Sequence, residues 1–240
     1  MNANTQAGVN LHGLLDNPYP GRGIIMGRNP DGNLVQIYWV MGRSESSRNR
    51  VLETIPDKHG WLRTNIAKQD GYKGDPSLLI YNAMAEERNY YVVSNGTQTD
   101  AVIANDNIDA LEYDNWEYEP DNPNFTPRIT GVIRYKSGNL ISMRMMILRK
   151  SPFGDKCDRW GISFGEVAPG FGYFISTYQG DGNPLPSFHG EPLLMPINHT
   201  DPAEIAQMYW SALNKDNRVS LAVKIIPPDG PSKIQIINRH

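Results

Sequence analysis

Apolar segments joined in pairs by short turn signals constrain the fold of this chain more than any other feature. Four such pairs are present: 23–28 with 33–41, 78–86 with 90–96, 129–135 with 139–148, and 162–168 with 172–178. Their connections are Asn29-Pro30-Asp31-Gly32, Glu87-Arg88-Asn89, Lys136-Ser137-Gly138 and Pro169-Gly170. Short polar turns between apolar segments are typical of β-hairpins. The sequence therefore predicts mainly antiparallel sheets.

Helical signals are fewer. Asp201 and Pro202 suit the N-cap and first position of a helix, and apolar residues recur at helical spacing behind them, which predicts a helix over 202–216. A second helix is expected from Thr99 to about Tyr113, capped by Thr99 or Asp100. Residues 219–225 alternate as a strand. The pattern indicates an α+β fold, with residues 1–21 as an irregular lead-in and 22–240 as a single domain.

Composition excludes several classes of protein. Hydrophobic residues make up 39% and charged residues 20% of 240 residues, which is enough for a packed core. The net charge of −3 does not favour nucleic-acid binding. The one cysteine, Cys157, has no internal partner, so a reducing, cytoplasmic setting is expected. The first residues lack a secretory signal, and no apolar run approaches the roughly 20 residues that span a bilayer.

Two groups of polar residues lie at expected strand ends, where sites are often built. In the first, arginines accompany hydroxyl and amide side chains, a combination that suits a phosphate. Its members are Arg22, Arg43, Ser44, Asn49 and Arg50. In the second, Tyr81 and Asn82 accompany Ser94 and Asn95, whose groups suit an amide or an oxyanion. A solvated loop with surface ion pairs would also explain the first group, and a polar turn with a helix cap the second.

Two further segments carry titratable groups. Glu117, Glu119 and Asp121 lie beside Tyr118, and a carboxylate near a tyrosine can manage protons. An acidic surface loop is the alternative. The segment 174–192 offers the hydroxyls of Ser176, Thr177 and Tyr178 and a single histidine, His189. Asp181, His189 and Glu191 match no metal-ligand spacing, so no metal is expected.

Taken together, these elements resemble the archaeal-type IMP cyclohydrolase family. The resemblance rests on the arginine start at Arg22, the GRS…NR loop of 42–50, YN at 81–82, VVSNGTQTD at 92–100, Tyr118-Glu119-Pro120-Asp121, TPRI at 126–129 and ISTY at 175–178. It covers roughly residues 21–180. SNGTQTD and TPRI are its most specific pieces.

The resemblance implies a four-layer α-β-β-α sandwich similar to N-terminal-nucleophile hydrolases. Because the chain begins Met1-Asn2, no Cys, Ser or Thr would follow the initiator, and autocatalytic nucleophile chemistry is not expected. The implied activity is closure of 5-formamidoimidazole-4-carboxamide ribotide to inosine monophosphate (IMP) with loss of water, without a cofactor. The alternatives are a non-catalytic purine-ribotide-binding protein and an amidohydrolase acting on another small amide.

The resemblance also assigns residues. Glu119 is the expected proton-transfer group, with Tyr118 or Tyr81 assisting, while Asn82 and Asn95 orient or polarise the reacting amide and formyl groups. The residues expected to bind the 5′-phosphate are Arg22, Arg43, Ser44, Asn49 and Arg50. The remaining substrate contacts are Ser94, Thr126, Arg128, Thr177 and Tyr178. A purine ribotide is the expected partner, nucleic acid and membrane are not, and a homo-oligomer is compatible with the sequence.

Overall fold

The computed structural model describes residues 2–68, 79–136 and 139–240. Its helices are α1 (Ala3–Asp16), α2 (Glu45–Arg48), α3 (Gln98–Ala104), α4 (Ala110–Tyr113) and α5 (Pro202–Ala212). The first strands are β1 (Gly23–Arg28), β2 (Leu34–Met41), β3 (Arg50–Thr54), β4 (Leu62–Ile66), β5 (Asn82–Glu87), β6 (Tyr90–Ser94) and β7 (Arg128–Lys136). The others are β8 (Asn139–Lys150), β9 (Cys157–Phe164), β10 (Phe171–Ser176), β11 (Leu193–Pro196), β12 (Arg218–Ile226) and β13 (Lys233–Asn238).

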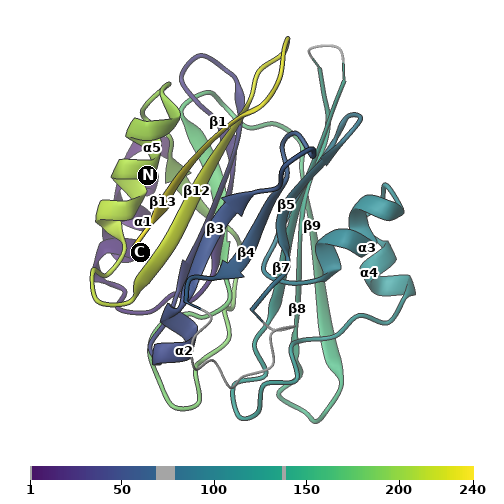
Figure 1. The fold of residues 1–240 in the computed structure, drawn as a ribbon, viewed down its shortest axis with the longest axis vertical. Coiled ribbons are helices and arrows are strands. Elements are labelled where there is room, and N and C mark those ends of the chain that lie inside the picture. The colour runs from purple at the N-terminus through teal and green to yellow at the C-terminus, as the bar shows by residue number, and fades with distance from the viewer. Residues whose placement is uncertain (1, 69–78, 137–138) are drawn as a thin grey trace.

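Two antiparallel sheets organise the described residues (Figure 1). One has six strands in the order β11-β10-β1-β2-β12-β13, and the other has seven in the order β3-β4-β5-β6-β7-β8-β9. Every strand pairing in both sheets is antiparallel. The predicted α+β class is confirmed at this level.

The largest apolar cluster lies between the two sheets. It joins Ile24 and Tyr38 of the six-stranded sheet to Val93 and Ile133 of the seven-stranded sheet, and all four are buried. Because successive residues of a strand face opposite sides, the neighbouring residues point to the outer faces. Burial of both faces explains why β1 and β2 are almost continuously apolar.

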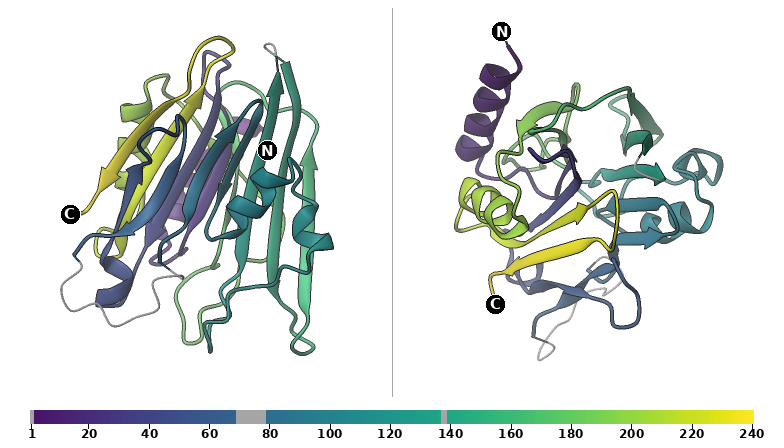
Figure 2. Two further views of the ribbon diagram at one scale, coloured as in Figure 1. Left: turned by 45° about the vertical axis from the view of Figure 1, so that its right-hand side comes forward. Right: turned by 90° about the horizontal axis from the view of Figure 1, so that it is seen from above.

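Helices cover the outer faces. Helices α1 and α5 pack against the six-stranded sheet, where Leu14 and Tyr209 join a cluster with Trp39. Helices α3 and α4 pack against the seven-stranded sheet through Val102 and Leu111. Figure 2 shows the two pairs of helices on opposite sides of the sheets. Within the described ranges, no helix is long and apolar enough to cross a membrane.

The first three predicted hairpins are confirmed as the pairs β1–β2, β5–β6 and β7–β8. Leu78 and the turn residues 137–138 lie outside the described residues. The fourth hairpin is wrong, because β9 pairs with β8 and β10 pairs with β1 and β11. The turn at 169–170 instead ends a connection that crosses from one sheet to the other. Phe164 of β9 stacks on Tyr173 of β10, with ring centroids 4.2 Å apart.

The irregular lead-in predicted for residues 1–21 is also wrong, because α1 occupies most of it. The Asn2 side chain accepts a hydrogen bond from the Thr5 backbone N–H and caps this helix. Asn10 then donates to the carbonyl of Leu194 in β11, at 2.8 Å. Tertiary contacts of this kind stabilise a helix whose apolar periodicity is weak. The domain boundaries remain a prediction.

Two helix boundaries differ from the prediction. The helix expected over 99–113 is divided into α3 and α4 by Asp106, whose φ of 47° lies in the left-handed region and ends the first segment. The helix expected over 202–216 begins as predicted, with Asp201 accepting hydrogen bonds from two backbone N–H groups. It ends at Ala212 because Leu213 is extended and buries its side chain.

A buried polar network links the two sheets. Lys224 of β12 is fully buried, and its Nζ donates to the carbonyl of Gly60 at 2.5 Å and lies 3.3 Å from a carboxylate oxygen of Glu86 in β5. Ser232 donates to the same carboxylate oxygen at 2.6 Å. Burial lowers the pKa of Lys224 to about 8, although Glu86 opposes the shift.

This pKa predicts a pH-dependent stability. Since the pKa of Lys224 is lower in the folded chain, the unfolded chain binds more protons between about pH 8 and pH 10, and the free energy of unfolding rises with pH there. Relative to Lys224→Met, the wild type should gain about 1–2 kcal/mol between pH 8 and pH 9.5. Denaturant unfolding at each pH measures this gain, and Lys233→Met, at an exposed position, is the control. Parallel pH profiles for wild type and Lys224→Met would contradict the shift.

Candidate active site

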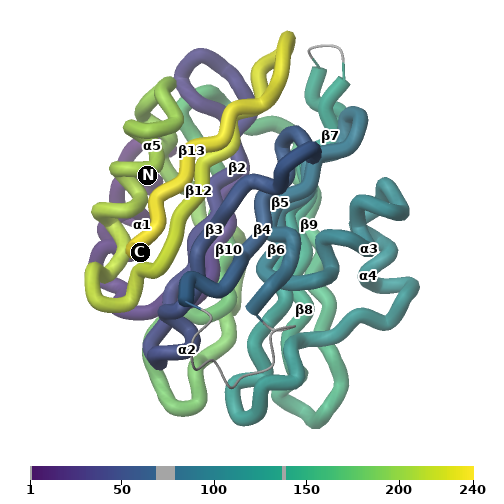
Figure 3. Tube along the Cα trace, viewed as in Figure 1, coloured from purple at the N-terminus to yellow at the C-terminus, as the bar shows by residue number. Residues whose placement is uncertain are grey.

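Polar side chains from both sheets meet at one end of the molecule. In the six-stranded sheet, β1 begins at Gly23, which pairs with Ser176 at the end of β10. In the seven-stranded sheet, Ser94 at the end of β6 pairs with Thr130, near the start of β7. The residues just beyond these strand ends therefore share one end of the fold. Figure 3 shows α2 at this end, whereas the β12–β13 connection lies at the other.

A buried ion pair forms the centre of this end. Nη2 of Arg22, just before β1, donates to Oε1 of Glu119 at 2.6 Å. The two residues are 9% and 5% exposed. Thr177 fixes the chain at Arg22, because its hydroxyl accepts from the Arg22 backbone N–H at 3.1 Å and its own N–H donates to the Arg22 carbonyl. The pair therefore joins the 114–127 loop to the start of β1.

Burial and the opposite charge of the partner shift the pKa of each member of this pair in opposite directions. Burial raises the pKa of the Glu119 carboxyl above its ordinary value, and the nearby positive charge of Arg22 only partly offsets that shift. For Arg22, burial alone would lower the pKa, but Glu119 and the neighbouring tyrosines outweigh it and the guanidinium stays charged. The result is a carboxyl group that gains a proton more readily than an exposed glutamate.

Asn95 holds Glu119 in place. Its Nδ2 donates to Oε1 of Glu119 at 3.1 Å and to the carbonyl of Pro127 at 2.9 Å. Its Oδ1 accepts from the backbone N–H of Ile129 at 2.8 Å and from Gln98 at 3.1 Å. These four bonds occupy both polar atoms of the Asn95 amide, so the geometry suits orientation of the carboxylate better than direct binding of a ligand.

Gln98 is a buried member of the site that the sequence reasoning did not single out. It donates to Asn95 and accepts from Nη1 of Arg128 at 3.0 Å. Arg128 also donates to the carbonyl of Glu117 at 2.9 Å. Gln98 thus connects the residue that orients Glu119 with the guanidinium at the start of β7. The available signal for Gln98 was its position in the SNGTQTD segment, but the same segment is also typical of the start of a helix.

The segment that carries Glu119 is folded back on itself. The Glu119 backbone N–H donates to the carbonyl of Thr126 at 2.8 Å, and the Thr126 N–H donates to Asp121 at 2.6 Å. The Thr126 hydroxyl bonds both Asp121 and the hydroxyl of Tyr178. Burial raises the pKa of Tyr178 to about 12, so its hydroxyl stays protonated near neutral pH. Thr126 therefore ties the loop to the end of β10.

Two further tyrosines lie beside the pair. The hydroxyls of Tyr38 in β2 and Tyr81 before β5 are 2.6 Å apart and buried. Burial and Tyr81 raise the pKa of Tyr38, while the positive charges of Arg22 and Arg50 oppose the rise. Arg50 is itself buried, and it donates to the carbonyls of Ser47 and Met41 at 2.8 and 3.2 Å. The hydroxyl pair thus lies among positive charges.

Arg43 lies at the edge of the same end. Its guanidinium packs over the ring of Tyr19 at 5.0 Å, and Tyr19 stacks on Tyr178 at 5.9 Å. It also bonds the carboxylate of Asp181 and donates to the carbonyl of Gly182 at 3.0 Å. The Arg43 side chain is partly exposed to solvent.

Other candidate residues have local structural roles. Ser44 caps α2, Asn49 bonds the backbone of Lys68, and Asn82 donates to Asp100 at 2.7 Å. The Tyr118 hydroxyl donates to the carbonyl of Asp155 at 3.0 Å, and Ser94 bonds Thr99 at 2.5 Å. None of these contacts involves Glu119. For the serines and asparagines the reason is that short hydroxyl and amide side chains at turns bond neighbouring groups first.

Across the ranges that the structure describes, His189 bonds Arg149 and not Glu119. Its Nδ1 is 2.8 Å from Nη1 of Arg149, and burial followed by the charge of Arg149 lowers its pKa. Among the described residues, no three His, Cys, Asp or Glu side chains are placed to hold a metal ion.

Replacement of Gln98 tests the network. Gln98→Met keeps the volume but leaves Asn95 Oδ1 and Arg128 each short of a buried partner, so the free energy of unfolding should fall by about 1–3 kcal/mol. Denaturant unfolding measures the loss, and Gln207→Met on the exposed face of α5 is the control. Equal stability of the two variants would refute the proposed bonds.

Comparison with known families agrees with the motifs at this end. A search of curated proteins finds no match to the chain. The family model described as IMP cyclohydrolase-like protein matches residues 19–230, a range that includes Arg22, Asn95, Glu119 and Tyr178. It also extends beyond the resemblance read from residues 21–180 to include α5 and β12. Since the match spans most of the sequence, this chain belongs to the IMP cyclohydrolase-like protein family.

Proposed function

We propose that this protein is an IMP cyclohydrolase that closes 5-formamidoimidazole-4-carboxamide ribotide to IMP. The observation that carries the proposal is the buried Arg22–Glu119 pair, with Asn95 bonded to the same carboxylate oxygen. It offers a titratable group beside fixed donors, as a proton-shifting reaction requires. Family membership supports a purine ribotide as the substrate class.

The reaction asks for proton movement rather than a strong nucleophile. The carboxamide nitrogen of the substrate attacks its formyl carbon, a C–N bond forms, and the proton that this nitrogen loses passes to the formyl oxygen, which becomes a hydroxyl. The former formamido nitrogen then loses its proton, a C=N bond forms, the C–O bond breaks, and the hydroxyl takes up that proton and leaves as water. Glu119 accepts the proton from nitrogen and returns it to oxygen in these transfers, so its charge is restored in each cycle. Since both reacting groups belong to one molecule, holding them together supplies much of the rate.

Supporting roles follow from position. Asn95 and Gln98 keep the carboxylate in one orientation, and Arg22 keeps a positive charge beside it. The hydroxyl pair of Tyr38 and Tyr81 lies close enough to Arg22 to help raise the pKa of its guanidinium, and it is suited to a carbonyl oxygen.

In this proposal, arginines near the edge of the Glu119 end of the molecule bind the 5′-phosphate of the substrate. Arg43 is the accessible one, and the phosphate would displace Asp181 from its guanidinium. Arg50 and Arg128 add positive charge from positions held by backbone carbonyls. In this scheme Ser44 and Asn49 shape the loop that carries Arg43 and do not bind the phosphate themselves.

The two-sheet arrangement also supports a proposed relation to N-terminal-nucleophile hydrolases, with the sheets and outer helices as four layers. We also propose that the reaction occurs in the cytoplasm and that the purine ribotide is the molecule that the protein binds there.

The deciding experiment incubates the pure protein with the formamido ribotide and follows IMP by its absorbance and by mass. Formation of IMP in proportion to protein supports the proposal. Binding without IMP would instead indicate a ribotide-binding protein, and release of formate would indicate an amidohydrolase.

Removal of the titrating group should impair the chemical step. Glu119→Gln keeps the shape of the side chain, so IMP binding should change little while kcat falls by roughly 10²–10⁴. Because burial raises the pKa of Glu119, wild-type activity should be lost on acidification at a pH above the ordinary value of 4.5. Rate–pH profiles measure both effects, and Glu117→Gln, an exposed neighbour, is the control. Normal turnover in Glu119→Gln would assign the proton transfer to another group.

Arg43 should matter for binding and not for chemistry. Arg43→Ala removes a hydrogen bond to a charged phosphate and should weaken IMP binding by about 1.5–3 kcal/mol. Isothermal titration calorimetry measures the change. Arg63→Ala is a matched control, because Arg63 is similarly exposed and paired with a carboxylate, Glu53. Equal affinities of the two variants would rule out Arg43 as a phosphate ligand.

A further inference from the structure

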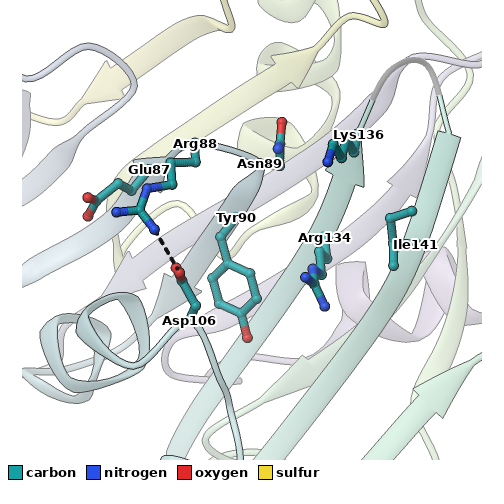
Figure 4. A pocket seen from close by; sticks show the side chains of 8 residues that line it. All are labelled: Glu87, Arg88, Asn89, Tyr90, Asp106, Arg134, Lys136 and Ile141. Atoms are coloured by element: carbon teal, nitrogen blue, oxygen red, sulfur yellow. Dashed lines mark hydrogen bonds and ion pairs between the residues drawn. The ribbon is translucent and has the colours of Figure 1, made fainter.

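A cavity lies at the opposite end of the seven-stranded sheet from Glu119. Its volume is about 330 Å³, and the β5–β6 turn, the turn after α3 and the ends of β7 and β8 form its walls. Figure 4 shows Arg134 and Lys136 next to each other along β7. The Arg88–Asp106 pair lies on the other side of the Tyr90 ring.

Two of its cations lack a counter-charge. Arg134 and Lys136 are exposed and lie two residues apart on β7, which puts both side chains on one face of the sheet. Within the described part of the chain, neither side chain makes a hydrogen bond or an ion pair. Arg88 differs, because its guanidinium lies 3.4 Å from a carboxylate oxygen of Asp106. The Glu87 carboxylate points away from Arg134 and Lys136 in Figure 4. The β7 side of the cavity therefore keeps a net positive charge.

The same cavity has an apolar part. Ile141 of β8 lines it and is 54% exposed, which is unusual for so large an apolar residue in a sheet. The pairing of β7 with β8 is shifted here, since Arg134 pairs with Ser142 and Tyr135 with Leu140, leaving Ile141 without a partner. Such β-bulges change the direction of a side chain. Tyr90 pairs with Arg134 and contributes its ring, and burial raises its pKa to about 12, so the hydroxyl carries no charge that would repel an anion.

We infer that this cavity binds a small organic phosphate monoester, with the phosphate on Arg134 and Lys136 and an apolar or aromatic group against Ile141 and Tyr90. Arg134 can bind two phosphate oxygens at once, and Lys136 adds a point charge. The volume is at the lower end of the range for small-molecule sites, so a metabolite fits better than a polymer. The site is separate from the one proposed for the ribotide.

Phenyl phosphate is a suitable probe because it carries both chemical features. Titration of the ¹⁵N-labelled full chain should shift the amide signals of residues 88–90 and 134–136, and inorganic phosphate should bind there more weakly. Arg134→Gln/Lys136→Gln should weaken phenyl phosphate binding by about tenfold or more, since two charge-assisted bonds are lost. Lys215→Gln/Lys233→Gln removes the same charge from exposed positions elsewhere and should leave the affinity unchanged.

Three outcomes would overturn the inference: shifts confined to other residues, equal losses in both double variants, or inorganic phosphate binding as tightly as the phenyl ester. If the double variant does not fold, each single substitution, Arg134→Gln or Lys136→Gln, should still weaken binding severalfold, and unchanged affinity in both would also contradict the site.

Discussion

The buried ion pair between Arg22 and Glu119 is the contact on which the arrangement of this end of the molecule depends. Two charges removed from water are costly unless each is paired and hydrogen-bonded. Asn95 supplies part of that compensation through the same carboxylate oxygen, and Thr177 fixes the backbone that carries the arginine. The 114–127 loop, the end of β6 and the start of β1 are therefore held together by one charge pair.

The same pair connects fold to chemistry. Antiparallel sheets stacked face to face bring the ends of distant strands together, so an arginine and a glutamate 97 positions apart in sequence can form an ion pair. Burial then gives Glu119 a raised pKa, which an exposed loop carboxylate would not have. Glu117 shows the contrast, since it lies two residues away, is exposed, and contributes only its carbonyl to Arg128.

The sequence predicts the structure correctly where the signal is local. Hairpins such as β1–β2 follow from a turn and two adjacent apolar segments, and Asp201 with Pro202 locates the start of α5. The prediction from sequence is wrong where contacts between distant segments determine the structure. Helix α1 depends on packing against β11, and β9 and β10 follow each other in the chain but belong to different sheets. In the site, motif resemblance selected Glu119, but only the geometry showed that Gln98 joins Asn95 to Arg128.

A crystal structure of the protein with IMP tests the central claim most directly, because it locates the product relative to the buried pair. The account predicts the six-membered ring within hydrogen-bonding distance of Glu119 and the phosphate on Arg43, with Asp181 displaced. IMP bound elsewhere, or an empty Glu119 site in crystals saturated with IMP, would contradict it.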